Sequence, residues 1–243
     1  MYMRTLLTGM IFIALSAAAT ADEWVAQKIA KLEGFEAPES VAVDPESGYA
    51  YVTNMNPKMG DDGEPRYWEN DGEGFISRIA YLKNDGKSGA VEGKWIKDRN
   101  WARLFSPKGA CLVGNRLTIA DNSRVLVYDI NNTDTVPIVI KVPDAENIND
   151  IASDGESVYA SDTARGKIYK IARNGTVETL EGPEAVNGVT FFDGKLYAVS
   201  WDNHEIYEMP SLKPFGLADN FKALDTIEVL DDGSFLVSDF KGN

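Results

Sequence analysis

The chain contains one cysteine and one histidine in 243 residues, Cys111 and His204. A lone cysteine cannot form an internal disulfide, so packing or a bound ion must stabilise the fold. Zinc, iron and copper sites usually recruit several histidine or cysteine ligands, so centres of that kind are disfavoured. Basic residues are scarce as well, with 24 Lys and Arg against 38 Asp and Glu and a formal net charge of -14. This acidity argues against nucleic-acid and membrane-surface partners and favours cations.

Other absences limit the possible fold classes and reaction types. No long stretch after residue 21 repeats its apolar residues with the period of a helix, which predicts an all-β protein. The sequence has no glycine-rich phosphate loop, no serine-centred nucleophile elbow and no cysteine-pair metal motif, so nucleotide binding and serine hydrolysis have no support. Hydrophobic residues make up 44% of the chain and charged residues 26%, which is enough for a sizeable core.

The N-terminus predicts export. Arg4 precedes an apolar run from Leu6 to about Ala14, and the small residues Ala19-Thr20-Ala21 follow it. This pattern is typical of a secretory signal with an Ala-x-Ala cleavage site, and the run is too short to span a bilayer. We therefore expect residues 1–21 to be removed and residues 22–243 to form one domain that is periplasmic or secreted, with no membrane insertion.

A repeated unit runs along the rest of the chain. Each copy reads as an apolar strand, a glycine-containing turn, an aromatic or β-branched strand and a small or acidic residue. The copies are ESVAVDPESGYAYVTN from Glu39, KGACLVGNRLTIAD from Lys108, NDIASDGESVYASD from Asn149, NGVTFFDGKLYAVS from Asn187 and DTIEVLDDGSFLVSD from Asp225. The last four copies start 41, 38 and 38 residues apart. Asp154-Gly155, Asp193-Gly194 and Asp232-Gly233 supply the tight turns.

Third and fourth strands follow most copies, as in GKIYKIA and TVETLEG. Four short antiparallel strands repeated about every 40 residues are the signature of a β-propeller, and a β-sandwich would not repeat its register so faithfully. We predict a six-bladed propeller with blades starting near residues 39, 108, 149, 187 and 225, whose last blades are incomplete in this chain. Residues 24–38 could add a strand that closes the ring, and residues 56–73 are expected to form a loop over one face.

The first residue of each unit is the candidate functional position. In a propeller the first strand of a blade lines the central channel, so these residues are expected to point towards one axis. They are Glu39, Lys108, Asn149, Asn187 and Asp225. Carboxylates and amides gathered there would be costly to bury without a partner, and a hard cation bound by oxygen ligands resolves that cost. Lys108 could neutralise the carboxylates as an ion pair or contact a substrate.

These motifs resemble the senescence marker protein, gluconolactonase and luciferin-regenerating-enzyme family of six-bladed propellers. Glu39 in ESVAVD, Asn149 in NDI, Asn187 in NGV and Asp225 in LDT fall in the same blades and the same order as the family's site residues. The resemblance implies that Glu39, Asn187 and Asp225 ligate a divalent ion and that Asn149 contacts the substrate or a metal-bound water. Ca²⁺ is the expected ion, with Mn²⁺, Mg²⁺ or Zn²⁺ as alternatives.

Two functions follow from this interpretation. The first is a metal-dependent hydrolase that opens a lactone or related ester, with Asp225 as the catalytic proton acceptor and Asn149 and Lys108 as substrate contacts. The second is a non-catalytic propeller that binds a partner and keeps a structural ion in its channel. Both predict a monomer, and the first predicts a small-molecule substrate in the channel. Tyr67 and Trp68 could either cap the channel or pack on a blade.

Overall fold

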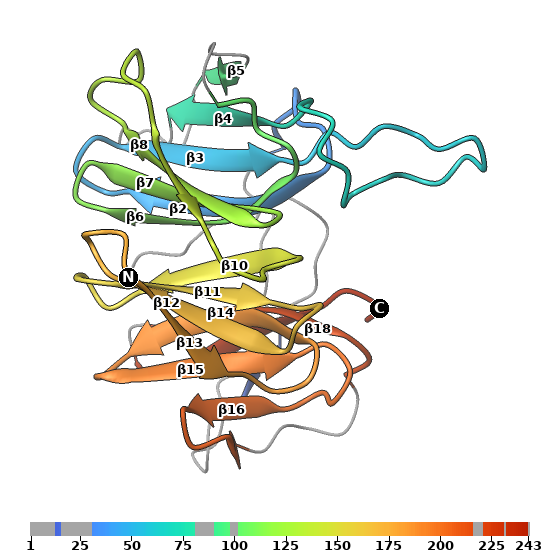
Figure 1. The fold of residues 1–243 in the computed structure, drawn as a ribbon, viewed down its shortest axis with the longest axis vertical. Helices are drawn as coiled ribbons and strands as arrows, with labels where there is room; N and C mark the ends of the chain where they lie inside the picture. The colour runs from blue at the N-terminus through green and yellow to red at the C-terminus, as the bar shows by residue number, and fades with distance from the viewer. Residues whose placement is uncertain are drawn as a thin grey trace. The chain divides into compact units, whose positions relative to one another are not determined.

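The computed structural model describes residues 13–15, 31–80, 90–97, 102–215, 221–230 and 232–242. Its regular elements over these ranges are all strands, which confirms the predicted all-β class. The strands form four antiparallel sheets of four strands each and one sheet of three (Figure 1). In each four-stranded sheet the strands pair in chain order, as in a propeller blade.

The strand bounds follow the predicted repeat closely. The first sheet contains β2 (Pro38–Asp44), β3 (Tyr49–Asn54), β4 (Phe75–Ala80) and β5 (Val91–Ile96), and the second contains β6 (Pro107–Val113), β7 (Arg116–Asp121), β8 (Arg124–Asp129) and β9 (Ile138–Lys141). The third contains β10 (Ile148–Ser153), β11 (Val158–Asp162), β12 (Lys167–Ile171) and β13 (Val177–Glu181). The fourth contains β14 (Val186–Phe192), β15 (Lys195–Ser200), β16 (Ile206–Met209) and β17 (Lys213–Phe215). The fifth contains β18 (Leu224–Val229), β19 (Phe235–Asp239) and β1 (Ile13–Leu15).

The chain divides into two compact units. One comprises residues 29–148 and holds the first two sheets, and the other comprises residues 1–28 and 149–243 and holds the remaining three. In the first unit β2 lies against β6, and in the second unit β14 lies against β18. Within each unit, therefore, the first strands of successive blades are neighbours, as a propeller requires.

The core lies between successive blades. In the unit of residues 29–148, one cluster joins Tyr51 and Ile76 of the first blade to Leu117 of the second. In the other unit, Ile168 of the third blade packs in one cluster with Val189 of the fourth. Strands whose side chains alternate between two such clusters bury both faces of the sheet, which explains why the middle strands are nearly continuous apolar runs.

The predicted turns are confirmed. Gly155, Gly194 and Gly233 have φ angles of 92°, 75° and 82°, which glycine adopts without steric cost. Asp193 also has a positive φ, of 48°. In the turn of the third blade, Asp154 Oδ1 accepts the backbone N–H groups of Glu156 and Ser157 at 2.8 and 2.7 Å.

The small or acidic residue that closes each unit ties two segments of its blade together. Asp121, at the end of β7, accepts the backbone N–H groups of Phe105 and Ser106 at 2.9 and 2.8 Å. Asp239, at the end of β19, accepts those of Lys222 and Ala223 at 2.8 and 3.0 Å. These carboxylates fix the segment that leads into the first strand, so their role is structural.

The sequence predicts a signal peptide at the N-terminus and a ring-closing strand within residues 24–38. Residues 31–37 form no strand, and residues 24–30, which were expected to help close the ring, lie outside the described residues. Instead β1 pairs with β19, through Ile13 and Val237 among others. Because β1 lies within the predicted signal peptide, a chain cleaved after Ala21 would lack this third strand.

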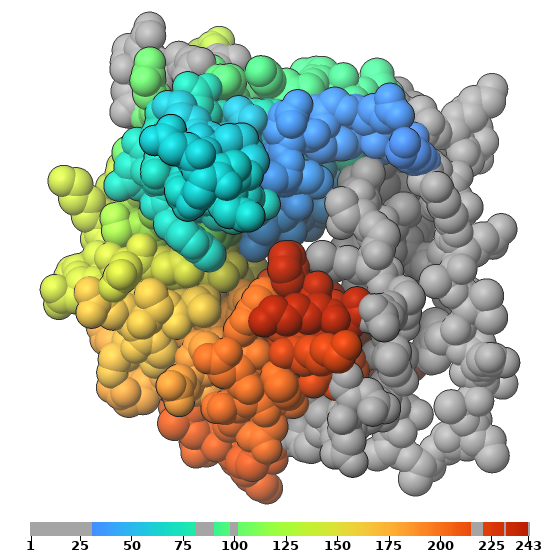
Figure 2. Space-filling view, turned by 90° about the vertical axis from the view of Figure 1, so that its right-hand side faces the viewer, coloured from blue at the N-terminus to red at the C-terminus, as the bar shows by residue number. Residues whose placement is uncertain are grey.

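The predicted loop at residues 56–73 joins β3 to β4. It extends well beyond the ends of these strands in Figure 1 and forms a compact surface mass in Figure 2. One bridge inside it pairs Met59 with Pro65, and Arg66 forms an ion pair with Asp62 at 2.6 Å. The loop therefore has its own internal structure.

Candidate functional site

Four of the five predicted positions share one backbone feature, a β-bulge near the start of the first strand. In these blades the pairing with the second strand is irregular over a short segment of the first strand. The segment contains Glu39, Lys108, Asn187 or Asp225 and the residue that follows it. In β10 the N–H of Asp150, which follows Asn149, donates to Ser161 Oγ at 3.0 Å. The N–H groups of Ser40 and Thr226 donate to hydroxyls in the same way. The five positions are thus structurally equivalent within their blades.

In the unit of residues 149–243 the structure brings Asn187 and Asp225 together. Asn187 Nδ2 donates to Asp225 Oδ1 at 3.1 Å, across the junction of the fourth and fifth blades. Asn187 is only 2% exposed. Burial raises the pKa of the Asp225 carboxyl, and the hydrogen bond from Asn187 offsets part of that rise. A carboxylate with this elevated pKa is suited to accept a proton.

Asn149 lies in the same unit, on the third blade. Its Nδ2 donates to Thr163 Oγ1 at 3.1 Å, and the side chain is 8% exposed. Thr163 directly follows β11, so Asn149 is held against the end of the second strand of its own blade. With its Nδ2 engaged there, its Oδ1 is the atom suited to bind a cation or accept a substrate hydroxyl.

Asp150 is a buried group that the sequence analysis missed. Its Oδ2 accepts the N–H of Val189 at 2.8 Å, and its Oδ1 accepts the N–H of Ile151 at 2.8 Å. Burial raises the pKa of Asp150 to about 7, and the carboxylates of Glu228 and Asp225 add to the rise. One signal could have revealed it: Asp150 is acidic where the equivalent residues Ser40, Gly109, Gly188 and Thr226 carry no charge.

In the unit of residues 29–148 the predicted residues Glu39 and Lys108 interact. Lys108 is 2% exposed, and its Nζ donates to Asn122 Oδ1 at 2.9 Å and to the Ser106 carbonyl at 3.3 Å. Burial lowers the pKa of Lys108 to about 8, while the negative charges of Glu39 and Asp121 oppose that shift. The electrostatic attraction between Lys108 and Glu39 supports the interpretation that Lys108 neutralises this carboxylate.

The insertion loop covers this lysine. Lys108 Nζ lies 4.8 Å from the ring centroid of Trp68, a distance at which the ring attracts a cation. Asn122 Nδ2 donates to Asn70 Oδ1 at 2.8 Å and to the Trp68 carbonyl at 3.3 Å. Ser106 Oγ donates to the Tyr67 carbonyl. Trp68 therefore lies over Lys108 of the second blade.

The residue that follows the second strand forms a second set of equivalent positions. Asn122 and Thr163 each contact the first-position residue of their own blade, as described above. Trp201 and Phe240 occupy the same place in the fourth and fifth blades, and their rings lie 5.3 Å apart. Phe240 is 63% exposed. An exposed aromatic ring, Phe240, and the half-buried ring of Trp201 therefore lie at the same end of the blades as Asn187 and Asp225.

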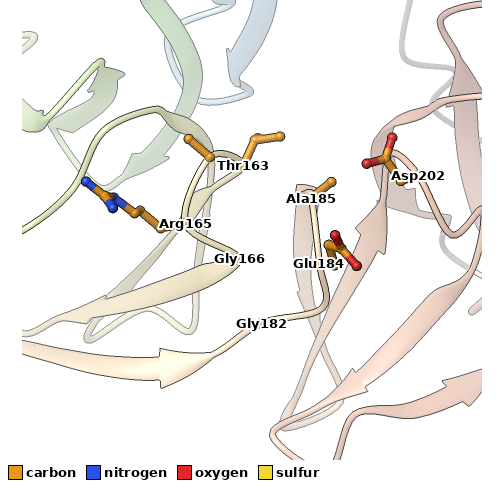
Figure 3. A pocket seen from close by; sticks show the side chains of 8 residues that line it. Thr163, Arg165, Gly166, Gly182, Glu184, Ala185 and Asp202 are labelled. Carbon is orange, nitrogen blue, oxygen red and sulfur yellow. The ribbon is translucent and has the colours of Figure 1, made fainter.

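A groove lies between the third and fourth blades at this end (Figure 3). It has a volume of about 510 Å³ and is lined by Thr163 on one side and by Glu184, Ala185 and Asp202 on the other. Arg165 also lines it, but its guanidinium points away from the two carboxylates (Figure 3). Thr163 links the groove to Asn149, and the N–H of Trp201 donates to the Ala185 carbonyl at 3.0 Å. A groove of this volume can hold a small molecule.

The donor set fits a hard cation better than a transition metal. Within the described ranges, no group of three or more His, Cys, Asp or Glu side chains is arranged to hold a metal ion. The predicted set differs, because it combines the carboxylate of Asp225 with the amides of Asn187 and Asn149. Asn187 and Asp225 are close enough to share one ion, provided that the Asn187 amide turns so that Oδ1 replaces Nδ2. His204 lies away from these groups in sequence, in the β15–β16 connection, with a φ of 56°.

No family model and no curated protein matches the chain. Solved structures do match. The selenomethionine-substituted virginiamycin B lyase of Staphylococcus aureus is 14% identical with a TM-score of 0.53, covering 82% of this chain and 76% of its own. A streptogramin B lyase is 12% identical with a TM-score of 0.52, covering 87% and 85%. A catalytically inactive S. aureus virginiamycin B lyase with quinupristin is 15% identical with a TM-score of 0.52, covering 89% and 78%.

At these identities the likeness shows the β-propeller fold alone. The predicted fold class is confirmed, and the finer resemblance to the gluconolactonase family stays a prediction. Among the described residues, no helix is long and apolar enough to cross a membrane.

Proposed function

We propose that this protein is an exported, metal-dependent hydrolase that opens a lactone or related ester, as the resemblance to the gluconolactonase family implies. The observation that carries the proposal is the contact between Asn187 and Asp225, two buried or half-buried oxygen-bearing side chains brought together from successive blades. Asn149 of the same unit would join them in holding the divalent ion, for which Ca²⁺ is the first candidate, and Glu39, the further ligand predicted from the sequence, belongs to the other unit. When bound, such an ion supplies Lewis acidity to the substrate carbonyl.

Side chains of the unit that contains residues 149–243 account for the attack of water and the proton transfers. A water molecule attacks the ester carbonyl carbon, and Asp225 accepts the proton that the water loses. The ring C–O bond then breaks, and the departing alkoxide takes up the proton that Asp225 accepted, which gives a hydroxy acid and restores the carboxylate. Burial has raised the pKa of Asp225, which makes it a stronger base than an exposed aspartate.

The groove beside Thr163 is the proposed substrate site. Asn149 would orient the substrate oxygens, and the exposed ring of Phe240 beside the half-buried Trp201 offers apolar contact for the rest of the molecule. Lys108 belongs to the other unit, where it lies buried beneath Trp68, and of its two predicted roles we propose the first, which is to offset the negative charge of Glu39.

The first test is thermal unfolding with and without Ca²⁺, for the wild type, Asp225→Ala and the control Asp232→Asn. An ion that binds the folded state must raise the melting temperature. We expect the increase in the wild type and in Asp232→Asn, because Asp232 only caps its own turn through the N–H of Ser234. The increase should vanish in Asp225→Ala. If Ca²⁺ leaves the melting temperature of the wild type unchanged, the proposed ion site is wrong.

A panel of lactones, analysed by mass spectrometry, then separates three functions. Hydrolysis adds the mass of one water to the substrate. The similar structures are lyases, and a lyase would open the ester by elimination, which leaves the mass unchanged and creates a double bond. A protein that binds Ca²⁺ and turns over no member of the panel supports the alternative function, a binding propeller with a structural ion.

A further inference from the structure

The junction between the third and fourth blades contains a carboxylate that the proposed chemistry does not use. We propose that Asp150 is a positioning residue, which holds Asn149 and Asn187 in a fixed relation across this junction. The inference rests on the proposed function, since it assigns a role relative to the proposed ligands Asn149 and Asn187. Asp150 itself is not proposed to touch the ion or the substrate.

The contacts of Asp150 run to both blades. On β10, its own N–H donates to Ser161 Oγ at 3.0 Å and its Oδ1 accepts the N–H of Ile151 at 2.8 Å. Towards β14, its Oδ2 accepts the N–H of Val189 at 2.8 Å. Asn149 is the residue before Asp150, and Asn187 lies two residues before Val189. One carboxylate therefore fixes the backbone next to both asparagines.

The first two blades, in the other unit, are also linked by a side chain that accepts a backbone N–H group of the next blade, but the side chain is a serine. Ser40 follows Glu39 as Asp150 follows Asn149, and Ser40 Oγ accepts the N–H of Ala110 at 3.1 Å. Ala110 lies two residues after Lys108, just as Val189 lies two residues after Asn187. A hydroxyl can thus make the link between blades, which shows that the link and not the negative charge is the common element.

The junction between the fourth and fifth blades has no side chain at this position. A Cβ atom on Gly188 would lie 2.7 Å from the Cα of Thr226 and 2.9 Å from the carbonyl oxygen of Asp225. The two strands approach so closely that Asn187 and Asp225 reach each other directly. Asp150 bridges the wider junction by hydrogen bonds, and Gly188 allows direct backbone contact at the narrower one.

The carboxylate provides a stronger link than a hydroxyl. Its two oxygens accept two backbone N–H groups at once, one on each strand, and hydrogen bonds to an ionised group are stronger than those between neutral groups. Burial and the nearby carboxylates of Glu228 and Asp225 oppose this ionised form. The two hydrogen bonds, one to each strand, fix the backbone geometry on both sides of the junction.

The test compares the wild type with Asp150→Ala, Asp150→Ser and the control Asp154→Asn. Asp154 lies on the same hairpin, where its Oδ1 closes the turn and its Oδ2 accepts the Tyr159 hydroxyl, and asparagine keeps the oxygen that closes the turn. The measurements are the Ca²⁺ affinity, from the concentration dependence of the melting temperature, and the ¹H–¹⁵N signals of the Val189 backbone and the Asn187 side chain. We expect Asp150→Ala to weaken Ca²⁺ binding at least tenfold and to shift both signals. Asp150→Ser should recover most of the affinity, because Ser40 makes the same link.

The outcomes are decisive in each case. If Asp150→Ala folds and binds Ca²⁺ as the wild type does, with the Asn187 signal unchanged, the inference is wrong. If Asp150→Ala does not fold, Asp150→Ser decides: a folded variant with undiminished affinity supports the link, and one with affinity lost tenfold or more overturns it. If the wild type binds no Ca²⁺, the proposed function fails, and the Asn187 signal alone then tests the positioning role.

Discussion

The ammonium nitrogen of Lys108 lies 4.8 Å from the ring centroid of Trp68, and these residues are separated by 40 positions in the chain. The insertion loop thus covers a lysine that is 2% exposed, while Trp68 itself is 61% exposed. Burial lowers the pKa of this lysine to about 8, so a measurable fraction of its amine is neutral just above neutral pH. Two predictions follow from this relationship.

Removing the Trp68 ring should expose the amine. We expect Trp68→Ala to increase the rate at which Lys108 is acylated by an amine-reactive ester at pH 8, by several-fold, while Trp68→Phe keeps the slow rate. Peptide mass spectrometry measures the rate at Lys108 against that at Lys213, which is exposed in every variant. Equal Lys108 rates in all three proteins would mean that the ring does not shield the amine.

Replacing Lys108 should change how stability depends on pH. The pKa of Lys108 is about 8 in the folded protein and 10.5 for the unperturbed side chain. Between these values the unfolded chain binds more protons, so this residue makes the free energy of unfolding rise with pH, by up to about 1.4 kcal/mol per unit. We expect Lys108→Met to lose that rise. Urea unfolding of both proteins from pH 7.5 to 10 measures it, and identical slopes would contradict the lowered pKa.

Much of the fold could be predicted because the repeat fixes it locally. The Asp-Gly turns and the ten-residue spacing from Asn187 to Tyr197 set strand lengths and register without knowledge of distant contacts. The predicted blade starts lie one residue after the observed first strands begin, for example at Asn187 against Val186. The short edge strand β17 was missed, since three residues carry too weak a pattern.

The candidate site could be predicted only in part. Equivalent positions in the repeat identify Asn149, Asn187 and Asp225 as candidates, and a β-bulge places Asn187 and Asp225 alike in their blades. The partners of these residues depend on how blades pack, which no local pattern encodes. The bond from Val189 to Asp150 spans 39 residues, and that from Asn122 to Asn70 spans 52. Such contacts required the structure.

The close approach at Gly188 gives a steric prediction. A Cβ atom there would lie 2.7 Å from the Cα and 2.8 Å from the N of its neighbours Thr226 and Ile227, which are backbone atoms that cannot rotate away. We expect Gly188→Ala to lower the free energy of unfolding by about 1–3 kcal/mol or more, as overpacking does.

Gly93→Ala is the matched control, because it also lies in a strand and its added Cβ would meet only the Gly34 carbonyl oxygen, at 3.7 Å. Chemical denaturation of both variants measures the difference. If the two alanines cost the same, the fourth and fifth blades are farther apart than described.

The hydroxyl of Tyr128 should contribute nothing favourable. It is buried, and within the described residues it has no hydrogen-bond partner. Burial raises the pKa of Tyr128, which leaves the hydroxyl neutral at every physiological pH. A buried polar group without a partner loses its hydration and gains nothing in return, so removing it is neutral or stabilising by about 1 kcal/mol. We therefore expect Tyr128→Phe to unfold at the same denaturant concentration as the wild type or a higher one.

Tyr159→Phe is the contrasting variant. The Tyr159 hydroxyl donates to Asp154 Oδ2 at 2.8 Å, so its removal should destabilise the protein by about 1 kcal/mol. Both tyrosines are largely buried, at 3% and 7% exposure, and the two substitutions delete the same atom. The difference between the variants therefore isolates the hydrogen bond. A Tyr128→Phe protein that is less stable than Tyr159→Phe would reveal a partner for Tyr128, and the second blade would then have to pack differently around it.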